Sequence, residues 1–464
     1  MGIVHAKDNS DLKMPQFGIP KAEINYDEIE ESRSIPLDVP VRVDTISING
    51  LSRTKDDIVE DATKDIFKSK NFREVLYNAH KARLKLETLS CFRNIAVHID
   101  VSRGPKATPE GLDVTFQVKE LKRVVGGVNT EVGNNEGSVV VGLRVPNAFG
   151  RGERVFVEYS YGSRKSNNFS VGAVKPLMGK YEPKISASVF QNVAEVAASG
   201  YKELERGFAV DFGLLSFANV RHNFQYKGST RELGVLSKSS SFEVRENSGP
   251  TLKSALAHIL TVDLRDDLIF PACGTLFQLN TEFAGIGGNI GFLKNDLYVQ
   301  SNISVLKDVV IQGTLGGGFL KGIGNDMQIG MSDMFFLGGP LDLRGFQMRG
   351  IGPRADGDAL GAEMYWSAGL HLFTPLPFRP GKGGFGDIFR THFFVNAGNV
   401  ATEKSEEKYV DQMSKNVRLS TGLGIAVRLG QMARVEINYC FPIKFSDGDQ
   451  TQPGVQFGIG LQFS

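Results

Sequence analysis

The last ten residues, Val455-Gln-Phe-Gly-Ile-Gly-Leu-Gln-Phe-Ser464, alternate strictly between large apolar side chains and small or polar ones. Successive side chains of a β-strand point to opposite faces, so this stretch predicts a strand with one apolar face and one small, wet face. The interior of a soluble β-sandwich could cover the apolar face, and so could the lipid around a β-barrel. The stretch therefore predicts a strand and leaves its environment open.

The same alternation recurs in the two preceding stretches, Arg418–Leu429 and Arg434–Phe441. In the second stretch Arg434, Glu436 and Asn438 share one face, opposite an apolar face. Charged residues of one parity suit a polar lumen better than a dry core. About sixteen strands with mostly short connections are expected, which is typical of a membrane β-barrel. They cover residues 121–131, 137–145, 153–163, 167–175, 181–191, 204–216, 219–236, 250–263, 274–285, 291–304, 308–319, 359–374, 389–399, 416–429, 432–442 and 453–464.

Composition and targeting signals narrow the class of protein. The chain has 464 residues with 53 glycines, which fit the tight bends and close packing of barrel strands. A net charge of +1 gives no bulk electrostatic case for nucleic acid. There is no run of 18 apolar residues and no secretory signal, so we expect the membrane of a barrel of this kind to belong to an organelle.

Motifs for catalysis or metal binding are missing from the sequence. The three cysteines are scattered and odd in number, which argues against a disulfide framework or a zinc site. No nucleophile elbow, Walker loop or His-Glu-x-x-His pattern occurs. We therefore expect no enzyme activity, no cofactor and no metal.

The chain divides into three zones before and within the barrel. Residues 1–40 are acidic and proline-punctuated, and they predict a disordered arm. Residues 41–120 follow the order strand, helix, helix, strand, strand, which is enough for a small α+β domain. Thr54 and Asp57 form a capping-box pattern before its first helix, and Asn71 and Glu74 offer a cap for the second. Residues 121–464 form the predicted barrel. Its one long irregular connection, 320–358, carries apolar residues that require burial, so we expect it to fold into the lumen.

The long connection carries a resemblance to a known family. Leu337-Gly-Gly-Pro-Leu-Asp-Leu-Arg-Gly-Phe346 resembles the inward-folding loop of the outer-membrane assembly barrels that carry POTRA domains, and 41–120 resembles one POTRA domain. Other stretches resemble the metazoan central subunits of the mitochondrial sorting and assembly machinery. They are Val132–Ser138, Phe373–Gly381 and Thr391–Asn399.

The resemblance implies a function and a set of partners. It implies an insertase for β-barrel precursors in the mitochondrial outer membrane, with the POTRA domain in the intermembrane space. The implied partners are the precursors, metaxin-type cytosolic subunits, the inner-membrane cristae organising complex and membrane lipid.

The resemblance also assigns roles within the barrel. Leu343, Arg344, Gly345 and Phe346 form the lumen loop motif. Bacterial relatives offer the loop arginine two carboxylates, whereas His371 and Asn396 stand at those positions here, both with the parity of the polar face. We therefore expect neutral groups, Asn396 foremost, to hold Arg344. The alternative is a solvated arginine that only tunes the charge of the channel.

The two ends of the barrel predict a lateral gate. The first strand contains Gly126 and Gly127, and the last contains Gly454, Gly458 and Gly460, so packing across their seam is thin. An opened seam would offer unpaired edges to an incoming strand. The terminal signal of the family's precursors (polar, x, Gly, x, x, apolar, x, apolar) is also present, in Gln456, Gly458, Leu461 and Phe463.

Two other functions stay open at the level of sequence. A passive solute channel shares the alternation but does not account for the soluble domain or the Arg-Gly-Phe loop. A protein-import pore of the plastid type belongs to the same superfamily, but such pores usually carry several POTRA domains and a transit peptide.

Overall fold

The computed structural model describes most of the chain, which forms two compact units. The first unit comprises Met1–Val125 with the turns Arg144–Val155 and Val174–Glu182, and the second comprises the remainder. The described residues are 3–7, 37–103, 105, 107–133, 136–179, 181–306, 308–324, 327–376, 385–403, 409–430, 433–460 and 463.

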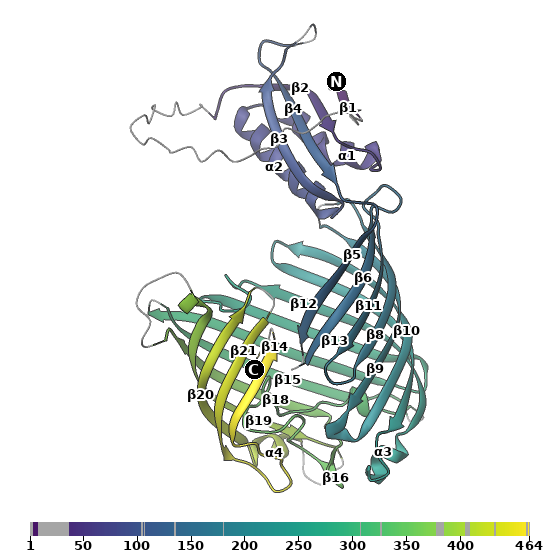
Figure 1. Ribbon diagram of the computed structural model, residues 1–464, viewed down its shortest axis with the longest axis vertical. Coiled ribbons are helices and arrows are strands. Elements are labelled where there is room, and N and C mark those ends of the chain that lie inside the picture. The colour runs from purple at the N-terminus through teal and green to yellow at the C-terminus, as the bar shows by residue number, and fades with distance from the viewer. Residues whose placement is uncertain are drawn as a thin grey trace. The chain divides into compact units, whose positions relative to one another are not determined.

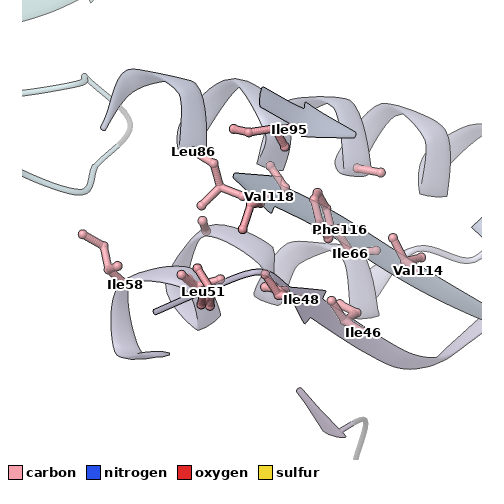
Figure 2. Close-up of a cluster of buried hydrophobic side chains, with 14 of the residues drawn as sticks. Ile46, Ile48, Leu51, Ile58, Ile66, Leu86, Ile95, Val114, Phe116 and Val118 are labelled. Carbon is pink, nitrogen blue, oxygen red and sulfur yellow. The ribbon is translucent and has the colours of Figure 1, made fainter. Parts of the chain in front are cut away.

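The first unit contains a four-stranded sheet in the order β1-β2-β4-β3. Strand β4 lies parallel to β2 and antiparallel to β3, and two helices pack on the sheet through the apolar cluster of Figure 2. Its elements are β1 (Ile3–Lys7), β2 (Arg42–Asn49), α1 (Asp56–Thr63), η1 (Lys64–Lys68), α2 (Phe72–Thr88), β3 (Phe92–Val101) and β4 (Gly111–Glu120).

Apolar residues at helical and strand spacing build this cluster. Helix α2 buries every member of one stripe, namely Val75, Ala79, Ala82 and Leu86. Its start is capped by Asn71, whose side chain accepts a hydrogen bond from the Glu74 amide at 3.2 Å, as the sequence predicts. Of the predicted disordered arm, only Ile3–Lys7 and residues 37–40 are described; Ile3–Lys7 pairs with β2 as β1, which the prediction did not anticipate.

The capping box predicted from Thr54 and Asp57 is wrong. The residue before α1 is Lys55, and it makes no side-chain cap. The Thr54 hydroxyl instead donates to Glu120 at 2.6 Å, and Asp57 pairs with Arg151. A carboxylate distant in sequence therefore competes successfully with the local cap.

The second unit is built on a sheet of sixteen antiparallel strands that curls into a barrel (Figure 1), which confirms the predicted fold class. All sixteen predicted strands are present. They are β5 (Val125–Gly133), β6 (Glu136–Pro146), β7 (Arg154–Gly162), β8 (Asn167–Pro176), β9 (Lys184–Val196), β10 (Tyr201–Phe217), β11 (Val220–Val235), β12 (Gly249–Asp263), β13 (Gly274–Gly288), β14 (Phe292–Leu306), β15 (Val309–Gly322), β18 (Met364–Thr374), β19 (Phe389–Ala401), β20 (Arg418–Leu429), β21 (Ala433–Lys444) and β22 (Gly454–Gly460).

Short elements lie in the connections. Residues 359–363, predicted as the start of a strand, belong to the long loop, because Ala359 pairs in a small hairpin within it. Among the described residues, no helix has both the length and the apolar character needed to cross a membrane. The short elements are η2 (Ala197–Ser199), α3 (Phe242–Glu246), η3 (Met331–Asp333), β16 (Arg354–Ala355), β17 (Asp358–Ala359), η4 (Phe385–Ile388) and α4 (Tyr409–Ser414).

Strand β21 shows how alternation places side chains. Its odd-numbered residues Ile437, Tyr439 and Phe441 are each close to half exposed on the outer face. Arg434, Glu436, Asn438 and Cys440 are buried on the inner face. The barrel interior in this region is therefore polar, as the shared parity of its charged residues predicts.

Substitution of Glu120 should loosen the first unit. Its carboxylate accepts hydrogen bonds from the amides of residues 52–54 and from the Thr54 hydroxyl. Although burial opposes the charge, these bonds hold the pKa of Glu120 below its usual 4.5. Glu120→Ala leaves these donors without their acceptor and should cost about 1–3 kcal/mol.

Hydrogen exchange of the amides of residues 52–54 in the full chain is the measurement. Glu120→Ala should accelerate it strongly at pH 7, and Glu120→Gln less. Because a lowered pKa stabilises only while the group is charged, the advantage of wild type over Glu120→Gln should fade as the pH drops below 4.5. Equal protection of wild type and Glu120→Ala at pH 7 would contradict the assignment.

Candidate functional site

The candidate site is the long loop between β15 and β18, residues 323–363, together with the barrel wall that holds it. The loop motif is fully buried: Leu343, Arg344 and Phe346 are each 0% exposed. The apolar part of the loop packs as one cluster against β19. Its members are Leu337, Leu343, Phe346, Ile351, Ala362 and Val400.

An ion pair inside the barrel fixes the motif. Arg344 donates two hydrogen bonds to the Glu436 carboxylate on β21, from Nε at 3.1 Å and from Nη2 at 2.9 Å. Both side chains are 0% exposed. Glu436 also faces Arg434, at 2.9 Å, so one carboxylate serves two guanidinium groups. A buried charge is stable only when it is paired in this way.

The prediction that neutral groups alone hold Arg344 is wrong, because Glu436 supplies a charge. Asn396 does contribute, since its side-chain oxygen accepts from Arg344 Nη1 at 3.2 Å. The alternative of a solvated arginine is also wrong, because the side chain is buried.

His371 is linked to the Glu436 carboxylate indirectly, through the imidazole of His392. Its Nδ1 is 3.0 Å from Nε2 of His392, and His392 Nδ1 lies 2.9 Å from the Asn438 side-chain oxygen and 3.6 Å from Glu436. The two imidazole rings stack, with centroids 5.3 Å apart. His371 therefore belongs to the polar network around Arg344 through His392.

The backbone of the motif is bound by the end of the chain. The side-chain amide of Gln456 on β22 accepts from the Gly345 amide at 2.9 Å and donates to the Phe346 carbonyl at 2.7 Å. The Gln452 amide donates to the Gly345 carbonyl at 2.7 Å. Gly345 has φ +84°, and a Cβ there would meet the Cβ of Ser420 at 3.2 Å, so glycine suits this turn.

Strands β5 and β22 are the two ends of the sheet order in the described part of the chain. Strand β22 pairs with β21 from Gly454 to Gly460, and Gly126 and Gly127 lie on β5. Of these glycines, Gly458 faces the loop, because a Cβ there would meet Pro340 at 3.1 Å. The predicted gate residues therefore all lie on the two edge strands, and Gly458 also touches the loop.

The end of the terminal signal pattern departs from the predicted strand. Leu461 lies outside the described residues, and Phe463 is 1% exposed rather than lipid-facing. Tyr298 donates to the Phe463 carbonyl at 3.1 Å, and the Arg434 guanidinium lies 4.3 Å from the centre of its ring. Because Phe463 itself is not in a strand, parity does not set the direction of its side chain.

Sequence reasoning missed Glu436 as the partner of Arg344. Its parity placed it inside the barrel with Arg434 and Asn438, and a glutamate inside a membrane strand requires a cation. The parity of Glu436 could therefore have identified it, but the expected partners, His371 and Asn396, lie on the first two strands after the loop, β18 and β19. The partner comes from β21, the fourth strand after the loop.

A sixteen-stranded barrel with an arginine loop fixed in its lumen defines a class of outer-membrane barrel, and the comparisons agree. Residues 147–463 match the Omp85 superfamily domain. The fold is similar to the crystal structure of BamA from Haemophilus ducreyi lacking POTRA domains 1-3. The TM-score is 0.74 at 18% identity, covering 90% of this chain and 84% of that one.

Relatives at the level of sequence match from end to end. Sorting and assembly machinery component 50 homolog B of Xenopus laevis is 43% identical over 470 residues, with all of both chains covered. The Homo sapiens homolog is 42% identical over 471 residues, again over all of both chains. The chain therefore belongs to the sorting and assembly machinery component 50 family of the Omp85 superfamily.

Substitutions at the ion pair should be unequal in effect. Removing one partner of a buried pair costs about 3–5 kcal/mol. Arg344→Ala leaves Glu436 with Arg434, whereas Glu436→Gln leaves two buried guanidinium groups facing one neutral amide. Glu436→Gln should therefore destabilise the barrel more, and both should release the loop.

The temperature at which the purified protein loses its compact mobility in detergent gels measures the effect. Asp356→Asn, in an exposed turn of the same loop, is the matched control and should behave as wild type. Wild-type stability of Arg344→Ala and Glu436→Gln would show that the pair does not hold the loop.

Proposed function

We propose that this protein inserts β-barrel precursors into the mitochondrial outer membrane by pairing with them at a gate between β5 and β22. One observation carries the proposal. Strand β22 is an edge of the sheet, and its Gln456 holds the backbone of the lumen motif at Gly345 and Phe346. An edge strand tied to the lumen loop joins a pairing surface to an internal support.

Backbone pairing supplies the driving force of this mechanism. An amide without a partner in lipid costs several kcal/mol, so a precursor strand gains by pairing before it meets lipid. Strands β5 and β22 end the sheet order of the described residues, and on this proposal their outer edges are the templates for such pairing when the gate opens. Strand pairing and lipid burial are sufficient, and the mechanism invokes no nucleotide, metal or catalytic step.

The last strand also resembles the signal that it would recognise. Gln456 and Gly458 occupy the polar and glycine positions of the terminal pattern, and both face the loop. A precursor strand with the same pattern would offer an equivalent amide to the motif backbone. On this proposal the lumen motif recognises the polar position of the signal, whichever strand carries it.

The assignment of parts and partners follows the same proposal. Residues 41–120 act as a single POTRA domain behind the arm 1–40, and 121–464 form the membrane barrel. The names of the relatives, which refer to a sorting and assembly machinery, support work within a complex. We propose metaxin-type subunits on the cytosolic side and the inner-membrane cristae organising complex as partners.

The rival functions fit the lumen less well. A passive solute channel requires an open path, whereas this lumen holds a loop whose Leu343 and Phe346 are fully buried. A protein-import pore would need the loop to leave a wide path for an unfolded chain. The buried ion pair of Arg344 and Glu436 opposes such movement.

Depletion followed by complementation tests the function and the gate together. Cells depleted of the protein should lose assembly of β-barrel precursors, and wild type should restore it. A variant with one cysteine in β5 and one in β22 should restore assembly when reduced. After oxidation has crosslinked the seam, assembly should fall at least tenfold, because both pairing edges are occupied.

The two parts of this test fail separately. Undiminished precursor assembly after depletion would refute the insertase function. Normal assembly through a quantitatively crosslinked seam would refute the gate alone. The control variant carries one cysteine in β21 and one in β22, two strands that are already paired. Oxidation of this variant should leave precursor assembly unchanged.

Orientation follows from the even number of strands. Sixteen antiparallel strands return the chain to the side of the membrane on which it entered. The start of β5 and the end of β22 therefore lie on the same side of the membrane. We propose that this is the intermembrane space. Protease added to intact mitochondria should spare residues 37–120, and rupture of the outer membrane should expose them. Digestion in intact mitochondria would reverse the proposed orientation.

A further inference from the structure

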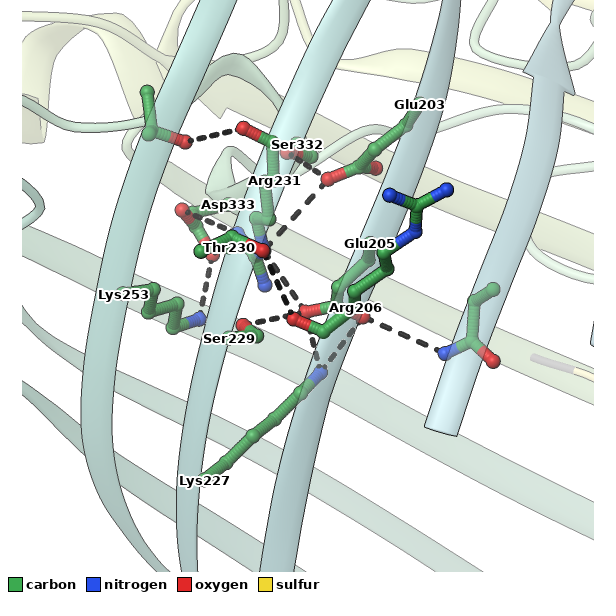
Figure 3. Close-up of polar contacts among 12 residues, drawn as sticks. Glu203, Glu205, Arg206, Lys227, Ser229, Thr230, Arg231, Lys253, Ser332 and Asp333 are labelled. Carbon is green, nitrogen blue, oxygen red and sulfur yellow. Dashed lines mark hydrogen bonds and ion pairs between the residues drawn. The ribbon is translucent and has the colours of Figure 1, made fainter. Parts of the chain in front are cut away.

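A second cluster of charges binds the loop to strands β10, β11 and β12 (Figure 3). Its carboxylates are Glu203 and Glu205 on β10, Glu282 on β13 and Asp333 in η3 of the loop. Its cations are Lys227 and Arg231 on β11 and Lys253 on β12. We call this set the Asp333 cluster.

Asp333 is the point at which the loop enters this cluster. Its carboxylate accepts from Arg231 at 2.9 Å and from Lys253 at 2.7 Å. Both Asp333 and Lys253 are nearly inaccessible, at 4% and 3% exposure. The backbone carbonyl of Asp333 accepts from Lys294 on β14 at 2.7 Å, and the neighbouring Ser332 donates to Glu203 at 3.0 Å. Side chains of four strands, β10, β11, β12 and β14, therefore contact η3 directly.

The cluster has neighbours that exclude water. Lys253 and Lys294 lie over the rings of Phe292 and Phe335, at 4.7 Å and 4.3 Å from the ring centres. Ion pairs in such surroundings are stronger than at a surface, and removing one partner strands a buried charge. The attachment of η3 to the wall is therefore firm.

The two attachments divide the sheet unequally. Arg344 is held by β19 and β21, and Asp333 by β11 and β12. One route along the sheet from β12 to β19 runs through β13, β14, β15 and β18. The other route, from β21 to β11, crosses from β22 to β5, the two ends of the sheet order in the described residues. A loop fixed at both places thus links the middle of the sheet, at β11 and β12, to the strands next to β22.

We propose that Asp333 is a second anchor of the loop, and that the loop is a tether that limits how far the seam between β5 and β22 opens. Ten residues lie between Asp333 and Arg344, and a segment of this length reaches at most roughly 40 Å when extended. The segment is not extended, because Leu337 pairs with Ile351 and the Gly339 amide bonds the Leu343 carbonyl. It is therefore a short, folded link with little slack.

This tether rests on the proposed gate, but its test does not depend on precursor assembly. Spin labels are placed at Val128 on β5 and Val455 on β22, whose side chains are 69% and 65% exposed. The exposed Cys273 is replaced by serine, and the buried cysteines are left in place. The distance between the two labels is measured by pulsed electron–electron double resonance on the full chain in lipid.

Asp333→Asn should lengthen or broaden the distance by about one strand spacing, roughly 5 Å. Arg231→Gln, which weakens the same anchor from the wall, should do the same. Asp333→Glu keeps the charge and should restore most of the wild-type distribution. Asp356→Asn, an exposed carboxylate of the same loop at φ +48°, should not change it.

Only variants that keep the compact mobility of the folded barrel in detergent gels are compared. A wild-type distance in folded Asp333→Asn and folded Arg231→Gln would overturn the tether. An equal shift in Asp356→Asn would overturn it too, because any change of loop charge would then suffice. If the seam shift appears while precursor assembly never depends on this protein, the proposed function fails and the tether stands.

Discussion

A single buried carboxylate organises the interior of this barrel. Glu436 lies between Arg344 of the loop and Arg434 of its own strand, and none of the three is more than 4% exposed. Three charges in that setting persist only while they stay together, since each alone would pay the cost of desolvation. The loop must therefore stay inside the barrel as long as β21 keeps its place, and the apolar packing around Phe346 can form on that fixed point.

The last strand depends on this point in turn. Gln456 forms hydrogen bonds to two backbone groups of the motif, so β22 is held from inside the lumen as well as by its ladder with β21. A seven-residue edge strand has few ladder hydrogen bonds, and its glycines add little side-chain packing. Support from the lumen therefore adds to the ladder in holding β22, which ends the sheet order in the described part of the chain. Barrels normally protect such an end by closure.

Much of the architecture could be predicted from residue alternation, because a membrane barrel imposes period two on every strand. Sixteen strands and the inward face of β21 follow from that rule alone. It fails where the chain stops being a strand, as at Phe463, whose direction is set by Tyr298 and Arg434. Alternation also does not give the height of a side chain along the barrel axis or the side chains that it contacts. Glu436 was therefore placed inside the lumen without being matched to Arg344. The capping box predicted at Thr54 is wrong for a similar reason, because the group that binds Thr54 is Glu120, 66 residues away in the sequence.

The choice of charges over apolar contacts at both ends of the loop has a physical consequence. Apolar packing is tolerant of sliding, whereas an ion pair in a dry site has one favourable geometry. Arg344 and Asp333 carry opposite signs, and each pairs directly with groups of the complementary sign, so exchanging the two ends would set like charges against each other. The loop can therefore adopt one register across the lumen. When β5 and β22 part and rejoin, as in the proposed gate, an internal link that cannot slip returns them to the same register.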